Sequence, residues 1–119
     1  MNEKRRPFTH CKIIRGDQTL WKGDPSVSGT RCCQVVVKSD EFISMHGTFQ
    51  VYCVEGTSKG IVDGKLSVPG PFSILFDQDF QGFQAATNKF RELIEGLERQ
   101  GFRKYSMSDE IAFQSKLNS

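Results

Sequence analysis

The stretch from Phe72 to Phe102 constrains the fold of this 119-residue chain more than any other segment. Phe72, Ile74 and Phe76 recur at every second position, which is the period of a β-strand. After residues 77–81 the apolar side chains recur at the three- and four-residue spacing of one helical face. These helical positions are Phe83, Ala86, Phe90, Leu93, Ile94 and Leu97. The stretch therefore predicts one strand that leads into one amphipathic helix.

Both ends of the predicted helix carry termination signals. Asp77 or Asp79 can accept hydrogen bonds from the free amides of the first turn, and a carboxylate is favoured at that end of the helix dipole. Gly101 suits the left-handed backbone position that follows a last helical turn. The face opposite the apolar residues carries Arg91, Glu95 and other charged side chains, so it is predicted to face solvent.

Short strand candidates separated by turn residues precede the strand of residues 72–76. A meander of short antiparallel strands has to curl or close. The predicted fold class is therefore β-rich α+β, with six to seven short antiparallel strands in a small barrel or curled sheet, packed by one long C-terminal amphipathic helix. The predicted organisation is a flexible basic arm (1–9), a single barrel-plus-helix domain (10–103) and a tail that could form a short helix (104–119). The strand candidates are residues 11–14, 19–21, 31–38, 42–45, 48–54, 61–62 and 65–68.

Composition places the chain among globular domains, because 37% of its residues are hydrophobic and 25% are charged. The sequence has no run of about 18 apolar residues, which a membrane-spanning helix would need. Its basic N-terminus is not followed by the apolar run of a secretory signal. The sequence therefore predicts no membrane span and a cytoplasmic location.

The cysteines and histidines show no catalytic or metal-binding pattern. Adjacent Cys32 and Cys33 would point to opposite faces of a strand, so they could not bind one ion together. The sequence has no Cys-x-x-Cys pair, no phosphate loop and no Gly-x-Gly-x-x-Gly, and neither histidine is spaced as part of a triad. We therefore predict no enzyme, no catalytic residue and no metal site. The residues concerned are Cys11, Cys32, Cys33, Cys53, His10 and His46.

Positive charge is concentrated in the first third of the chain. Residues 1–40 carry eight basic side chains against four acidic ones, whereas residues 41–119 carry eight against ten. The cluster Lys4-Arg5-Arg6 would attract phosphate, whether free or in a nucleotide, although a short basic run at a chain end also serves as a solubilising tail.

Two segments resemble the binding motifs of the PilZ domain. Arg5 and Arg6 precede the first strand candidate, and Asp24-Pro25-Ser26-Val27-Ser28-Gly29 lies between the second and third. PilZ domains carry Arg-x-x-x-Arg and Asp/Asn-x-Ser-x-x-Gly at these places. Here His10 or Thr9 stands where the second arginine is expected. The resemblance implies a six-stranded barrel with a trailing helix, a sensor of cyclic di-GMP or a similar phosphorylated ligand, and no other cofactor. It implies these ligand-binding residues: Arg5, Arg6, His10, Asp24, Ser26 and Gly29.

Two other functions are consistent with the same outline. Ala86 and Phe90 resemble the Ala-x-x-x-Phe helix that ends pleckstrin-homology-like folds, which implies a protein-interaction or adaptor module. Single-stranded DNA readers with four strands and a helix are also similar in outline, and the basic first half of the chain with Phe8, Trp21 or Tyr52 as a stacking platform would serve nucleic-acid binding. The sequence pI of 8.4 is below the value of about 9 that is typical of a dedicated nucleic-acid domain. The WGR domain has a similar outline too, but its Trp-Gly-Arg signature is absent.

Overall fold

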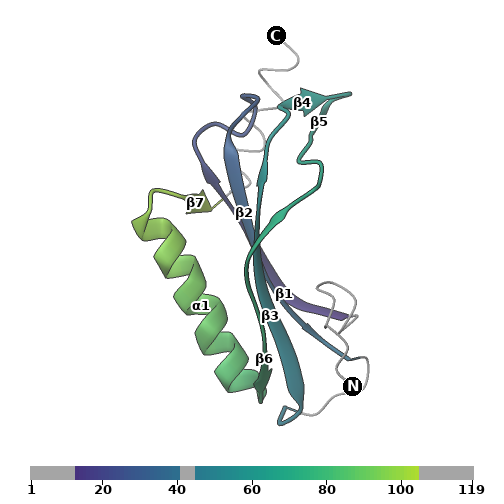
Figure 1. Ribbon diagram of the computed structural model, residues 1–119, viewed down its shortest axis with the longest axis vertical. Helices are drawn as coiled ribbons and strands as arrows, with labels where there is room; N and C mark the ends of the chain where they lie inside the picture. The colour runs from purple at the N-terminus through teal and green to yellow at the C-terminus, as the bar shows by residue number, and fades with distance from the viewer. Residues whose placement is uncertain (1–12, 41–44, 105–119) are drawn as a thin grey trace.

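The computed structural model describes residues 13–40 and 45–104. Within these ranges the protein is β-rich, with seven strands and one helix, so the predicted fold class is confirmed (Figure 1). The elements in chain order are β1 (Ile13–Lys22), β2 (Arg31–Ser39), β3 (Thr48–Thr57), β4 (Ile61–Val62), β5 (Lys65–Leu66), β6 (Ser73–Gln81), α1 (Phe83–Arg99) and β7 (Arg103–Lys104). No helix in these ranges is long and apolar enough to cross a membrane.

The main sheet has five antiparallel strands in the order β6-β3-β2-β1-β7, and β4 pairs with β5 in a separate hairpin. Within the described residues β6 and β7 lie at the two edges of this order and do not pair with each other, so the sheet is not closed into a barrel. The barrel alternative was therefore wrong, and the open sheet is consistent with the curled-sheet alternative.

The first strand is longer than the sequence pattern suggests. Gly16 and Asp17, which resemble a turn, pair with Val37 and Val36 inside β1. A β-bulge between Ile14 and Gly16 absorbs the glycine without ending the strand. Residues 24–29 therefore join the first and second strands, and the prediction that they join the second and third was wrong.

The start of α1 also differs from the prediction. Asp77 and Asp79 lie within β6, opposite Tyr52 and Gln50, and neither caps the helix. The N-cap is Gly82, which has no side-chain cap. Its amide and that of Phe83 donate to the carbonyls of Gly47 and Met45, at 2.7 and 2.8 Å. A turn that is distant in sequence therefore replaces the aspartate cap.

The end of α1 follows the prediction. Gly101 has a φ of +100°, and its amide donates to the carbonyl of Glu98 at 3.0 Å. The amide of Phe102 donates to the carbonyl of Leu97, also at 3.0 Å. These bonds satisfy carbonyls that a helix end would otherwise leave without partners.

α1 covers one face of the sheet with the apolar residues that its spacing predicts. Ala86, Ile94 and Leu97 are buried, and Phe90 and Leu93 pack against the same clusters. The sheet contributes alternate residues of β1, β2 and β3, because side chains alternate between the faces of a strand. These residues are Leu20, Cys33, Val35, Val37, Phe49, Val51 and Cys53.

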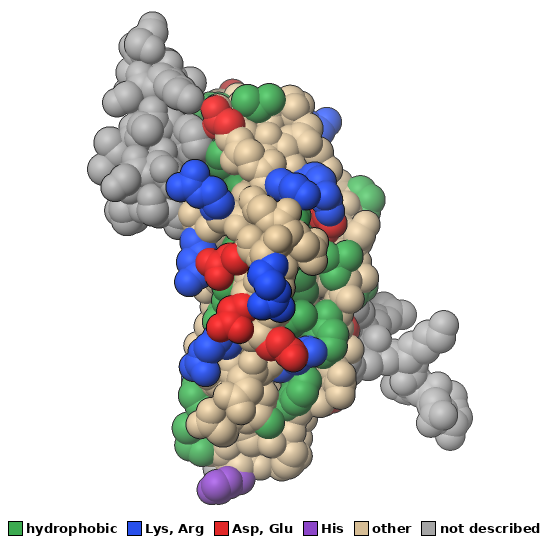
Figure 2. All heavy atoms as spheres, turned by 90° about the vertical axis from the view of Figure 1, so that its left-hand side faces the viewer, with side chains coloured by type: hydrophobic (Ala, Val, Ile, Leu, Met, Phe, Trp, Pro, Cys, Tyr) green, Lys and Arg blue, Asp and Glu red, His purple; other side chains and the backbone are tan. Residues whose placement is uncertain are grey.

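The outer side of α1 is charged. Figure 2 shows basic and acidic side chains interspersed on this side of the molecule. Lys89 and Glu92 form an ion pair of 2.6 Å on it. The predicted solvent-facing side of the helix is therefore confirmed.

Residues that alternate with this core lie on the other side of the sheet, which we call the second face. It carries an apolar cluster of Val36, Tyr52 and Val54, whose exposed fractions are at most 5%. Trp21 and Cys32, which pair across β1 and β2, belong to the same face and are also buried. The second face therefore carries a buried apolar cluster although α1 packs on the opposite side, and it also carries polar side chains, namely Gln34, Lys38 and Gln50.

Candidate functional site

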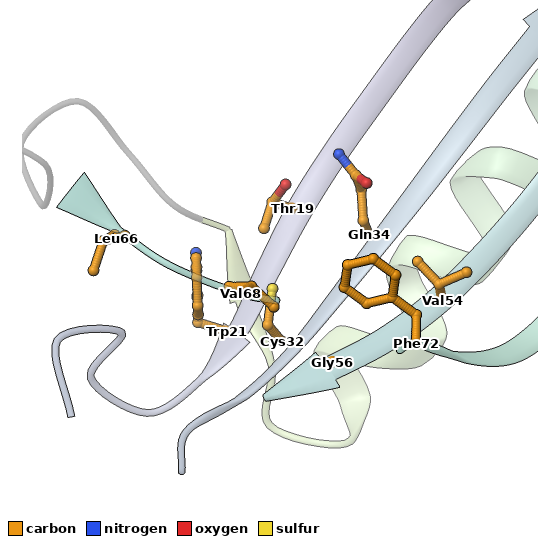
Figure 3. A pocket seen from close by; sticks show the side chains of 9 residues that line it. All are labelled: Thr19, Trp21, Cys32, Gln34, Val54, Gly56, Leu66, Val68 and Phe72. Carbon is orange, nitrogen blue, oxygen red and sulfur yellow. The ribbon is translucent and has the colours of Figure 1, made fainter. Parts of the chain in front are cut away.

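A pocket of about 290 Å³ lies on the second face, near the ends of β1 and β3 and the starts of β2 and β6 (Figure 3). Three neighbouring strands form its floor, and the connection that leads from β5 to β6 forms its wall. The nine residues that line it are Thr19, Trp21, Cys32, Gln34, Val54, Gly56, Leu66, Val68 and Phe72.

Strand register brings the floor residues together. Thr19 lies opposite Gln34 and Trp21 lies opposite Cys32 in the pairing of β1 with β2. In the next pairing, Gln34 lies opposite Val54 and Cys32 lies opposite Gly56. Because side chains on one strand face the same side at every second residue, these six residues form a continuous block on the second face. The floor is therefore a direct product of the sheet.

Gly56 allows the wall to approach the floor. A Cβ atom at this position would lie 2.8 Å from Cγ1 of Val68 and 2.9 Å from Cδ1 of Phe72. Both distances are shorter than a normal contact between carbon atoms, so any side chain here would push the wall outward. The absence of a side chain at Gly56 therefore sets how closely Val68 and Phe72 pack over the sheet.

Backbone hydrogen bonds and one buried serine hold the wall in place. The amide of Lys59 donates to the carbonyl of Ser67 at 2.8 Å, and the amide of Ser67 donates to the carbonyl of Gly60 at 3.1 Å. Ser58 is 2% exposed; its hydroxyl donates to the carbonyl of Pro25 at 2.6 Å and accepts from the amide of Gly60 at 2.8 Å. The end of β3, the wall and the loop of residues 24–29 are thereby linked.

The pocket is mainly apolar and carries no charged side chain among its nine lining residues. The indole of Trp21 and the ring of Phe72 flank it (Figure 3). Burial raises the pKa of the Cys32 thiol to about 11, so this thiol is neutral near pH 7 and a poor nucleophile. The arrangement suits binding of an uncharged group and offers no catalytic dyad.

The predicted PilZ-like residues are only partly described. Arg5, Arg6 and His10 lie outside the described residues. Oδ1 of Asp24 accepts hydrogen bonds from the amide and hydroxyl of Ser26, at 3.0 and 2.7 Å, which is an Asx turn. Gly29 has a φ of +99°, and its amide donates to the carbonyl of Ser58. The described part of the motif thus builds a turn between β1 and β2, and its ligand role stays a prediction.

A titration with cyclic di-GMP would test that predicted site. β1 runs from Ile13 to Lys22, and the loop of residues 24–29 follows directly after its end. Ile13 lies at the opposite end of this strand, which is roughly 30 Å long. If the predicted site exists, amide resonances should shift both in residues 4–10 and in residues 24–29. Changing Arg5 and Arg6 together to alanine should abolish binding, because each charge-assisted bond contributes about 1.5 to 3 kcal/mol. Shifts in neither segment would contradict the prediction.

None of the nine pocket residues belongs to the predicted site. The sequence carries a partial signal for the pocket, because the second-face side chains of β2 and β3 include Cys32, Val36, Tyr52 and Val54 beside polar residues. One amphipathic helix covers only one face of a sheet, so these four residues imply a second apolar cluster on the other face. The wall residues Val68 and Phe72 carry no comparable signal. Their position depends on contacts with Gly56, which is separated from them by more than ten residues in the sequence.

Within residues 13–40 and 45–104, no group of three or more histidine, cysteine or acidic side chains could hold a metal ion. The three cysteines in these ranges, Cys32, Cys33 and Cys53, are buried free thiols. Because neither a family model, nor a curated protein, nor a solved structure matches this chain, the geometry of the pocket is the basis for proposing a function.

Proposed function

We propose that this protein is a non-enzymatic protein-interaction module that binds an extended segment of a partner protein on its second face. One bulky side chain of that segment occupies the pocket. The observation that carries this proposal is the apolar pocket together with the exposed apolar side chains of Ile74 and Leu75, which follow the pocket residue Phe72 at the start of an edge strand. This proposal corresponds to the adaptor function that the resemblance of Ala86 and Phe90 to the helix of pleckstrin-homology-like folds implies.

The size of the pocket favours a single side chain. Its volume of about 290 Å³ lies just below the range of about 300 to 1,000 Å³ for pockets that bury drug-sized ligands. Recognition of extended peptides commonly combines such a side-chain pocket with main-chain contacts along a strand. The pocket therefore has a suitable size for one anchor residue of a peptide.

The surface beside the pocket favours a macromolecular partner. Phe72, Ile74 and Leu75 are exposed by 44%, 50% and 51%. Ile74 lies opposite Val54, a pocket residue, so this apolar surface is continuous with the pocket. β6 lies at the edge of the sheet order, where an added strand can form main-chain hydrogen bonds. A small molecule in the pocket would leave Ile74 and Leu75 exposed, whereas an extended peptide could cover them as well.

Selection from a displayed library of random 12-residue peptides against the full chain would test the proposal. The selected peptides should bind with an aromatic or aliphatic anchor. Phe72→Ala and Ile74→Asp should each weaken their binding by about tenfold or more, because interface residues that anchor a contact contribute more than about 1 kcal/mol. Affinity can be measured by titration calorimetry, with a heteronuclear NMR spectrum of each variant to establish that it is folded.

Ile14→Asp is the matched control, since Ile14 is exposed by 56% and lies at the far end of β1 from the pocket. This variant should bind the selected peptides as the unchanged protein does. A selection that yields no binder would overturn the proposal. The same holds for binders that tolerate Phe72→Ala and Ile74→Asp, or that lose affinity equally with Ile14→Asp.

The predicted cytoplasmic location is part of this proposal. It is supported by the three free thiols, because paired cysteines in oxidising compartments are normally found as disulfides. The pair Cys33 and Cys53 lies in one core cluster beneath α1 and still consists of two thiols.

A further inference from the structure

The pocket has a polar end. Thr19 and Gln34 are direct partners across β1 and β2. Figure 3 shows the hydroxyl of Thr19 and the carboxamide of Gln34 side by side at one end of the pocket, with the rings of Trp21 and Phe72 on its two sides. Both polar side chains are half-buried. A group in the pocket therefore meets aromatic rings on two sides and hydrogen-bonding atoms at one end.

These two polar groups differ from the side chains of Gln50 in β3 and of Thr30, which precedes β2. Gln50 donates through Nε2 to Oδ1 of Asp77 at 2.9 Å, and Thr30 donates through its hydroxyl to the carbonyl of Asp24 at 2.7 Å. Within the described ranges, no hydrogen bond to another residue involves the side chain of Thr19 or of Gln34. Their donor and acceptor capacity is therefore open to water or to a ligand.

An occupant without polar atoms would be disfavoured at this end. It would displace water from the Thr19 hydroxyl and the Gln34 carboxamide without replacing the lost hydrogen bonds, and a buried polar group without a partner is destabilising. A phenol can both donate and accept, as the hydroxyl and the carboxamide can, whereas an indole N–H only donates. The ring of the same group would lie between Trp21 and Phe72, where aromatic contacts are favourable.

We infer that the pocket selects a tyrosine side chain of the partner segment over phenylalanine, and that Thr19 and Gln34 determine this selectivity. The inference rests on the proposed function and adds the chemistry of the anchor residue. The tyrosine ring occupies the apolar part of the pocket, and its hydroxyl exchanges hydrogen bonds with Gln34 and Thr19.

The test compares N-acetyl-tyrosinamide with N-acetyl-phenylalaninamide as probes of the full chain. A single side chain should bind with a dissociation constant of roughly 1 mM, so NMR titration is the suitable measurement. The tyrosine probe should bind about five- to tenfold more tightly, which corresponds to one or two net hydrogen bonds. It should also shift the side-chain amide resonances of Gln34, which the phenylalanine probe should shift less.

Thr19→Val combined with Gln34→Leu should reduce the preference for the tyrosine probe to within about twofold, because both hydrogen-bonding groups are replaced by apolar groups of similar size. Gln78→Leu is the matched control, since Gln78 is an exposed glutamine of β6 that is not among the pocket residues. This control should retain the full preference. Both variants need a dispersed NMR spectrum before the comparison is made.

The outcomes separate this inference from the proposed function. If both probes shift pocket resonances with equal affinity, the inference is wrong and the pocket still binds side chains as proposed. A preference for the tyrosine probe that persists without Thr19 and Gln34 also overturns the inference. If neither probe shifts a pocket resonance the inference is wrong, and the proposed function is then decided by the response of selected peptides to Phe72→Ala and Ile74→Asp.

Discussion

Phe102→Ala is expected to lower the free energy of unfolding by about 3 to 5 kcal/mol, because it removes a fully packed aromatic side chain and leaves a cavity. Phe102 is 2% exposed and belongs to the core cluster that contains Leu20 and Leu97. It also connects α1 to the strand that follows, and the cationic groups of Lys22 and Arg31 lie 5.7 and 5.4 Å from its ring centroid. Urea denaturation followed by circular dichroism would measure the change.

Phe72→Ala is the matched control for this experiment. Phe72 is 44% exposed, so its truncation removes much less buried area and should cost less than half as much stability as Phe102→Ala. Equal losses at the two positions would contradict the placement of Phe102 in the core.

Ser58→Ala is expected to destabilise the protein through lost hydrogen bonds. The serine hydroxyl satisfies the carbonyl of Pro25 and the amide of Gly60, and its removal leaves both backbone groups without this partner. Each buried polar group left without a partner costs about 1 to 3 kcal/mol. The loss should be visible as a lower urea midpoint. It should also increase amide hydrogen exchange in the pocket wall, because the wall is attached through this site.

Ser28→Ala provides the control, because Ser28 lies in the neighbouring loop and is exposed. Its substitution should change stability by no more than about 0.5 kcal/mol. If Ser58→Ala were equally mild, water would be replacing the hydroxyl, and Ser58 would not be what attaches the wall.

The helix and its termination could be predicted from the sequence because their causes are local. The three- and four-residue spacing of Phe90, Ile94 and Leu97 defines one face whatever lies opposite, and Gly101 suits the position after the last turn. The start of α1 could not be predicted, because the carbonyls of Met45 and Gly47 take the place that an aspartate would have in an isolated helix. Tertiary contacts of this kind leave no local pattern.

The strands show the same division between local and distant causes. Alternation in β2 and β3 correctly assigns side chains to two faces. It does not reveal that Gly16 sits beside a bulge within one long strand, since glycine followed by aspartate is equally typical of a turn. The floor of the pocket could therefore be inferred from alternation. Its wall could not, because Val68 and Phe72 reach the floor only where Gly56 lacks a side chain.

The pairing of β7 with β1 has a consequence for the order of folding. The strands β1, β2 and β3 meet through successive hairpins, whereas Lys104 pairs with Leu20 from the other end of the described chain. Closing such a long loop costs more chain entropy than closing a hairpin, so this ladder is expected to form after the meander and the helix have assembled. Contacts made after the rate-limiting step mainly affect the rate of unfolding. Loss of the pairing between β7 and β1 should therefore increase the rate of unfolding and leave the rate of folding nearly unchanged.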